Sequence, residues 1–263
     1  MKKCFPQKLF LPVVFIIVVC LVCSTFAAAG EQTTKDETVN RLFDESWACL
    51  SRMHKDSHAL ERALDLLEKA KKIAPDNEAV YWRLAEVVFK MADEEKNKDR
   101  RRELYEKTID YSDKALAINP RSVGGHYWKG CACARLAEMS GPLSALGLVK
   151  KAKKELYAAI ETDGNHRYSI LARVVLAAIF TESPWPLRDL EKAEKLASRA
   201  VALDPRLSYA SLQLAKVYLA KGDIQAAKKE LQRGLSIKNP TYVWDSVLYE
   251  WPEMKELLKQ AEK

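Results

Sequence analysis

Apolar and small residues recur every three or four positions along most of the chain, which is the period of an amphipathic helix. Ala63, Leu67 and Ala70 form one such series and are followed by Pro75. A similar series near the C-terminus comprises Leu248, Trp251, Met254, Leu257 and Leu258. No window sustains the alternation of apolar and polar residues that a strand needs. The pattern therefore predicts an all-α chain.

The series recurs in one frame along the sequence. The spacing Ala63-x3-Leu67-x2-Ala70-x4-Pro75 resembles the second half of the 34-residue tetratricopeptide (TPR) consensus, and Trp47 occupies the aromatic position of its first helix. The repetition predicts an all-α TPR-type solenoid of about five helix hairpins over residues 39–241. The expected units are 44–77, 78–122, 123–165, 166–207 and 208–241. A helix within residues 242–263 is expected to cap the last unit.

Three units are longer than 34 residues, with the extra residues between the two helices of the hairpin. The first insertion, 92–102, is charged and is expected to lengthen both helices, whereas 139–144 is expected to form a small-residue loop. The third, Ser183–Pro186, predicts a rigid turn that presents Trp185 at the rim. Such insertions indicate either a functional rim or merely longer, self-packed hairpins.

The N-terminus has the order of a secretory signal. Lys2, Lys3 and Lys8 precede an apolar run, and Ala27–Ala29 resemble a cleavage site. We therefore expect a signal peptide over residues 1–29, a polar linker over 30–38, and a periplasmic or otherwise exported protein. An uncleaved membrane anchor is the alternative, because the run is about long enough to span a bilayer.

Charge and cysteine content change once this signal is removed. The sequence has 43 basic and 36 acidic residues, and three of the basic ones lie in the signal, which leaves a net charge of about +4. This charge gives no indication of a nucleic-acid partner. The lysine run 150–154 is interpreted as a solvated helix face, with anionic lipid as the alternative contact. Cys49, Cys131 and Cys133 predict buried apolar side chains, or one bridge from Cys49.

Candidate chemistry is sparse. His54 and His58 have the spacing of two metal ligands on one helix, but the residues between them indicate a turn. The sequence contains no nucleophile elbow, phosphate-binding loop or paired-histidine metalloprotease motif. We therefore expect a non-catalytic protein with no cofactor and no metal.

A binding surface is predicted from the repeat frame, because the first helices of stacked TPR units line the concave groove. Its expected residues combine aromatic and cationic side chains, which suit a protein or peptide partner. They are Arg52, Trp82, Glu86, Tyr127, Arg135, Arg167, Tyr209 and Lys216. Some of them, Trp82 in particular, are alternatively core residues between units.

A narrower resemblance covers Gly125–Pro205. This stretch contains GHYWKG, a Gly-Pro-Leu-x-Ala-Leu segment and SPWPL. It is similar to exported bacterial TPR proteins, including the periplasmic T component of TRAP transporters, and to the regulator-of-microtubule-dynamics family. The TRAP resemblance implies a periplasmic accessory protein that associates with a substrate-binding protein and holds a small hydrophobic or anionic ligand. It is kept as the alternative to a scaffold that binds a protein or peptide.

Overall fold

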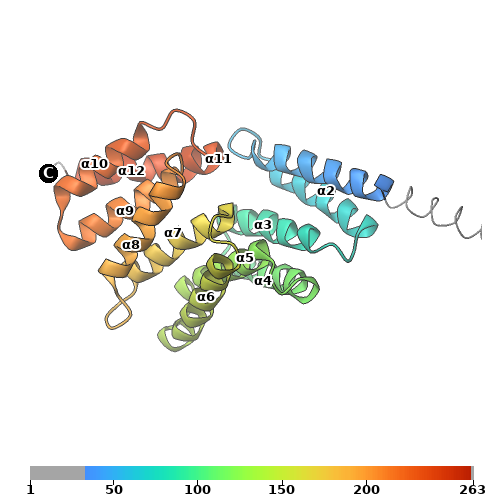
Figure 1. Ribbon diagram of the computed structural model, residues 1–263, viewed down its shortest axis with the longest axis horizontal. Helices are drawn as coiled ribbons and strands as arrows, with labels where there is room; N and C mark the ends of the chain where they lie inside the picture. The colour runs from blue at the N-terminus through green and yellow to red at the C-terminus, as the bar shows by residue number, and fades with distance from the viewer. Residues whose placement is uncertain (1–32, 262–263) are drawn as a thin grey trace, which may run out of the picture.

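The computed structural model describes residues 33–261, and these residues form helices without any strand (Figure 1). Five antiparallel helix pairs follow one another in an arch. They are 33–50 with α2 (Ala59–Ile73), α3 (Glu78–Glu94) with α4 (Lys98–Ile118), α5 (Val123–Glu138) with α6 (Pro142–Thr162), α7 (Arg167–Glu182) with α8 (Leu190–Leu203), and α9 (Ser208–Lys221) with α10 (Ile224–Leu235). The chain ends in α11 (Val243–Asp245), the π-helical turn η1 (Ser246–Glu250) and α12 (Trp251–Ala261). The predicted all-α TPR-type solenoid is confirmed.

Polar side chains and one glycine set the helix boundaries. Asn77 accepts a hydrogen bond from the Ala79 N–H at the start of α3, and Ser122 accepts from Gly125 at the start of α5. These N-caps satisfy backbone donors that have no partner within the helix. Gly222 ends α9 with a φ of 81°, a left-handed conformation that favours glycine. Local sequence therefore defines the hairpin ends.

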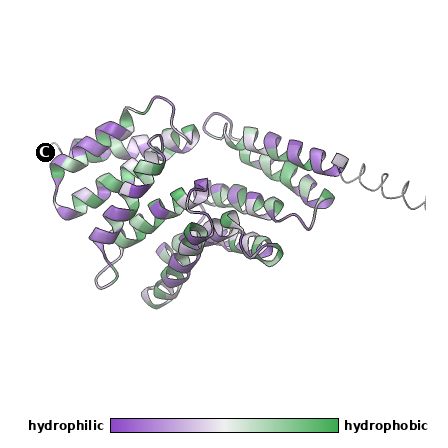
Figure 2. Cartoon of the chain, viewed as in Figure 1, coloured by the Kyte–Doolittle hydropathy of each residue, from purple (hydrophilic) through white to green (hydrophobic). Residues whose placement is uncertain are grey.

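Small residues at the repeat positions let the two helices of each pair approach closely. Ala63, Ala70, Ala193 and Ala200 are fully buried in their second helices, and Leu67 is equally buried beside them. Apolar residues lie along one face of these helices and charged residues along the other (Figure 2). The core is thus a continuous layer between successive helices rather than a single central cluster.

Two sequence expectations differ from the structure. Residues 33–38, assigned to a polar linker, already belong to the first helix, 33–50. The loop expected over 139–144 is only a short turn, because Pro142 begins α6. Proline is accommodated at the first position of a helix, where its missing N–H would have no partner.

The predicted lengthening of the second unit is observed, since α3 has 17 residues and α4 has 21. The predicted signal peptide, 1–29, lies outside the described residues. Within residues 33–261, no helix combines the length and the apolar character needed to cross a bilayer.

Candidate functional site

The first helices of successive pairs form the inner face of the arch, because α3 contacts α5, α5 contacts α7, and α7 contacts α9. Residues 242–250, here called the groove segment, lie against this face. The Trp244 ring meets the Trp47 ring edge-on at 5.3 Å, and Tyr242 contacts the same ring at 6.5 Å. Figure 1 accordingly shows α11 beside the N-terminal hairpin. The groove predicted to be open is therefore occupied by the chain itself.

Polar contacts fix the groove segment as well. Lys90 Nζ lies 2.6 Å from Asp245 Oδ1, and the Tyr249 hydroxyl donates to Glu94. Burial would lower the pKa of Lys90, but the carboxylates of Asp245 and Asp93 outweigh it and raise that pKa. Lys90 is therefore a charged anchor for the segment on α3.

Glu250 ends the groove segment as a buried carboxyl group. Its Oε2 accepts from the Ser208 hydroxyl, which lies 2.6 Å from the Ser246 hydroxyl. Burial raises the pKa of Glu250 to about 8, with a smaller contribution from Asp245, while Ser208, Ser246 and Lys90 oppose the shift. The carboxyl is therefore protonated in the folded chain near neutral pH.

The free energy of unfolding is expected to depend on pH through Glu250. A raised pKa in the folded state stabilises the fold fully below the unfolded pKa of about 4.5, and this stabilisation is lost as the pH rises toward about 8. Between pH 6 and pH 7.5 the wild type should therefore lose about 1 kcal/mol per pH unit relative to Glu250→Gln. Urea unfolding of both proteins at several pH values measures this difference, and parallel pH profiles would contradict the assignment.

A second buried cluster lies under the groove segment and contains three of the predicted site residues. Tyr168 Oη donates to Glu86 Oε2 at 2.8 Å, and Arg167 Nη2 donates to the Tyr168 oxygen at 2.8 Å. The Arg167 guanidinium lies 4.6 Å from the Trp47 ring centroid, and the Trp82 ring packs edge-on against Tyr168. Burial raises the pKa of Glu86 above its ordinary value, and the charge of Arg167 opposes part of this rise.

The remaining groove predictions have mixed outcomes. Tyr127 is buried and stacks on the Tyr168 ring at 5.1 Å, so neither it nor buried Glu86 can contact a partner in this conformation. The expectation that both are open binding residues is therefore wrong. Tyr209 is half-buried on α9, and Arg135 pairs with Asp93 and Glu138. Arg52 lies exposed in the turn before α2, apart from both clusters.

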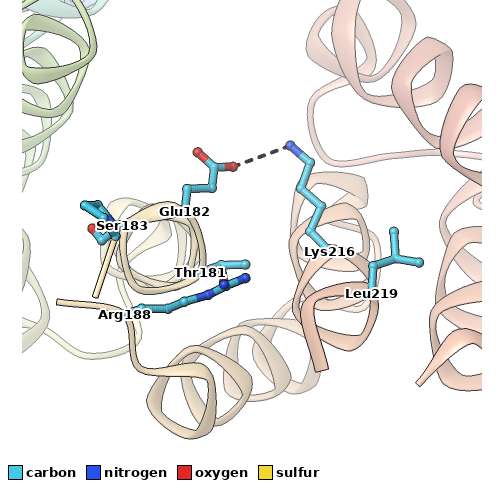
Figure 3. Close-up of a pocket in the computed structure, with 7 residues that line it drawn as sticks. Thr181, Glu182, Ser183, Arg188, Lys216 and Leu219 are labelled. Atoms are coloured by element: carbon cyan, nitrogen blue, oxygen red, sulfur yellow. Dashed lines mark ion pairs between the residues drawn. The ribbon is translucent and has the colours of Figure 1, made fainter. Parts of the chain in front are cut away.

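An open pocket of about 510 Å³ lies where the end of α7 and the following turn face α9 (Figure 3). Lys216 lines it and pairs with Glu182 at 3.7 Å and with Glu253 at 2.6 Å. Arg188 extends from the turn toward the helix that carries Lys216 (Figure 3), and it forms no ion pair with any residue in the range 33–261. The other residues that line the pocket are Thr181, Ser183, Pro184 and Leu219.

The pocket adjoins the predicted rim. Trp185 belongs to the same turn and is 86% exposed. Sequence reasoning identified Trp185 and Lys216 but missed Arg188 and Glu182, although the proline-rich insertion pointed to this turn. It also missed the groove segment, because residues 242–263 were interpreted only as a cap.

Other candidate chemistry is not assembled in the part of the chain that is described. His54 and His58 lie in the turn between the first two helices, and His58 Nδ1 is 2.9 Å from Glu61. No group of three or more His, Cys, Asp or Glu residues within 33–261 could hold a metal. Burial raises the pKa of the Cys131 thiol to about 12 and of the Cys133 thiol to about 11. These two and Cys49 are free thiols.

Comparisons with solved structures support the fold. The TPR protein TTC0263 of Thermus thermophilus is 18% identical with a TM-score of 0.62, and the match covers 85% of this chain and 98% of that one. Pseudomonas aeruginosa pilF is 14% identical with a TM-score of 0.58, and the match covers 87% and 90% of the two chains.

A sequence comparison with curated proteins gives no match. The family model described as regulator of microtubule dynamics protein 1-3 matches residues 48–262, which is most of the chain. This range includes the five second helices, the pocket and the groove segment. The chain therefore belongs to the regulator of microtubule dynamics protein 1-3 family.

Proposed function

We propose that the protein is a non-catalytic TPR scaffold that binds a protein or peptide partner at the pocket between α7 and α9. The observation that carries this proposal is the open pocket beside a tryptophan that is 86% exposed. Tryptophan and arginine are the side chains that most often dominate binding energy at protein interfaces. Trp185 and Arg188 lie three residues apart in one turn and supply both.

Charge indicates what the partner presents. Glu182 and Glu253 already pair with Lys216, whereas Arg188 forms no ion pair with a described residue. The Arg188 guanidinium is therefore available for a carboxylate, to which arginine can donate two parallel hydrogen bonds. An acidic side chain of the partner in the pocket, next to an apolar side chain on Trp185, fits this surface.

The variant Trp185→Ala/Arg188→Glu is expected to weaken partner binding at least tenfold. The exposed Trp185 ring and the unpaired Arg188 lie outside the core, so the fold should be retained. Affinity capture with the wild type identifies the partner, and isothermal titration with that purified partner then measures both dissociation constants. Arg121→Glu is a matched control, because Arg121 is exposed in the turn between α4 and α5 at the opposite ends of the helices. Equal affinities for all three proteins would refute the proposed site.

The pocket also favours a second candidate, the TRAP-type accessory function implied by the sequence resemblance. A volume of about 510 Å³ is within the range of small-molecule sites, and Arg188 and Lys216 suit an anionic ligand. In this proposal the partner is a substrate-binding protein, and the N-terminal segment exports or anchors the chain. Native mass spectrometry of protein purified from its source detects a bound small molecule, and it distinguishes an exported chain, which has lost residues 1–29, from an anchored chain, which retains them. A chain without any bound ligand would contradict this second candidate.

A further inference from the structure

The groove segment contacts the inner face as a bound peptide would. Tyr242 and Trp244 are buried, while Val243 between them and Val247 beyond them are about 40% exposed. Asp245 follows the second aromatic residue and pairs with Lys90. The segment therefore has two aromatic anchors separated by one residue, and then a carboxylate for a lysine whose side chain is 12% exposed.

The contacts come from first helices of distant units. Trp47 belongs to the first unit, Lys90 and Glu94 to α3, and Ser208 to α9. Each of these positions faces the inside of the arch, where TPR-type solenoids present their concave surface. The surface on which a partner was expected from the sequence thus already holds an occupant of defined chemistry.

The connections on either side of the groove segment allow it to leave while the rest of the C-terminus stays in place. Residues 236–241 before it are not helical. After it, α12 is held separately: Trp251 Nε1 donates to the Gly234 carbonyl at 3.2 Å, and Lys216 pairs with Glu253 at 2.6 Å. Pro252, the second residue of α12, has no N–H and cannot donate to a carbonyl of η1, so one backbone hydrogen bond between η1 and α12 is missing.

The contact of the segment with the inner face is also incomplete. The Trp244 indole N–H is buried and has no acceptor among the described residues. A buried donor without a partner costs free energy, and this cost weakens the hold of the inner face on the segment. The π-helical turn Ser246–Glu250 marks the same region, and such turns often occur at functional positions.

We propose that the groove segment is a displaceable intramolecular ligand of the inner face. The partner that replaces it is a peptide with two aromatic side chains separated by one residue and followed by a carboxylate. This inference rests on the proposed function as a partner-binding scaffold, and it adds a second surface and the class of peptide that the surface accepts. Tethering gives the segment an effective concentration on the order of millimolar, so it outcompetes a free peptide until it is weakened.

The test uses the full-length chain and a fluorescein-labelled peptide with the sequence of residues 240–251, PTYVWDSVLYEW. Fluorescence anisotropy should show that the variant Trp244→Ala/Asp245→Ala binds this peptide at least tenfold more tightly than the wild type does. A peptide with lysine at the position of Asp245 should bind that variant at least tenfold more weakly. Equal affinity of both proteins for the peptide, or of the variant for both peptides, would overturn the proposal.

A second measurement uses the wild type, so the proposal can still be tested if the variant Trp244→Ala/Asp245→Ala does not fold. Hydrogen exchange should be faster for the amides of residues 243–250 than for those of 254–261, and excess peptide should accelerate only the first set. Slow exchange of 243–250 that peptide leaves unchanged would overturn the proposal. Neither measurement needs a natural partner or the pocket residues. A negative result for partner binding at Trp185 and Arg188 therefore leaves the groove inference untouched, and a negative result here leaves the pocket proposal untouched.

Discussion

Replacing Arg167 with alanine is expected to lower the free energy of unfolding by about 2–3 kcal/mol, because buried Glu86 then loses the cation that most opposes the burial-driven rise of its pKa. Arg167 is the cation nearest to the Glu86–Tyr168 hydrogen bond, and its guanidinium also lies over the rings of Trp47 and Tyr168. The substitution removes these contacts and leaves Glu86 buried without its main compensating charge. Urea unfolding followed by circular dichroism at pH 7 measures the loss.

Two companion variants isolate the cause. Arg100→Ala removes an arginine that is 60% exposed and pairs with Glu103 on the same helix, so its cost should stay below about 1 kcal/mol. Adding Glu86→Gln to Arg167→Ala should recover at least about 1 kcal/mol, because the carboxylate that lost its partner is then gone. If Arg167→Ala costs the same in the wild type as in the Glu86→Gln background, the charge argument is wrong.

The variant Gly130→Val is expected to destabilise the fold by about 2–3 kcal/mol, toward the upper end of what overpacking costs. A Cβ at Gly130 would lie 2.7 Å from Leu156 Cγ and 3.3 Å from the Ala152 carbonyl oxygen. Leu156 is fully buried, so its side chain has little room to move away. The same unfolding experiment reports the effect.

Gly147→Ala is the matched control, since a Cβ there meets nothing within 4 Å and the residue is exposed in α6. It should stabilise the protein by about 0.5–1 kcal/mol, because glycine loses more backbone freedom on folding than alanine does. Effects of the same sign in the two variants would contradict the close helix approach at Gly130.

The sequence predicted the parts of the fold that depend on neighbouring residues. Ala63, Leu67 and Ala70 are all fully buried, because their spacing alone places them on the face of α2 that meets the first helix. The exposure of Trp185 likewise follows from a local proline-rich turn. Pro142 was misjudged because a proline can end a loop or begin a helix, and neighbouring residues do not distinguish the two.

The site was harder to predict, because it depends on the curvature of the whole arch. The ring contact between Trp47 and Trp244 joins residues almost 200 positions apart, and no spacing rule relates them. The helix series at Leu248, Trp251 and Met254 identified an amphipathic C-terminus but not which face receives it. Glu86 and Tyr127 were consequently assigned to an open groove, whereas both are buried against Tyr168.

The meeting of Trp47 with Trp244 has a consequence for how such a chain can evolve. In an open repeat array each unit contacts only its neighbours, so a unit can be duplicated or deleted with little effect on the others. Here an added unit would carry Trp244 and Asp245 away from Trp47 and Lys90 by a full repeat, and both contacts would be lost. We therefore expect the copy number of the repeat to be constrained as a whole, and length variation to concentrate in the hairpin tips that bear the insertions.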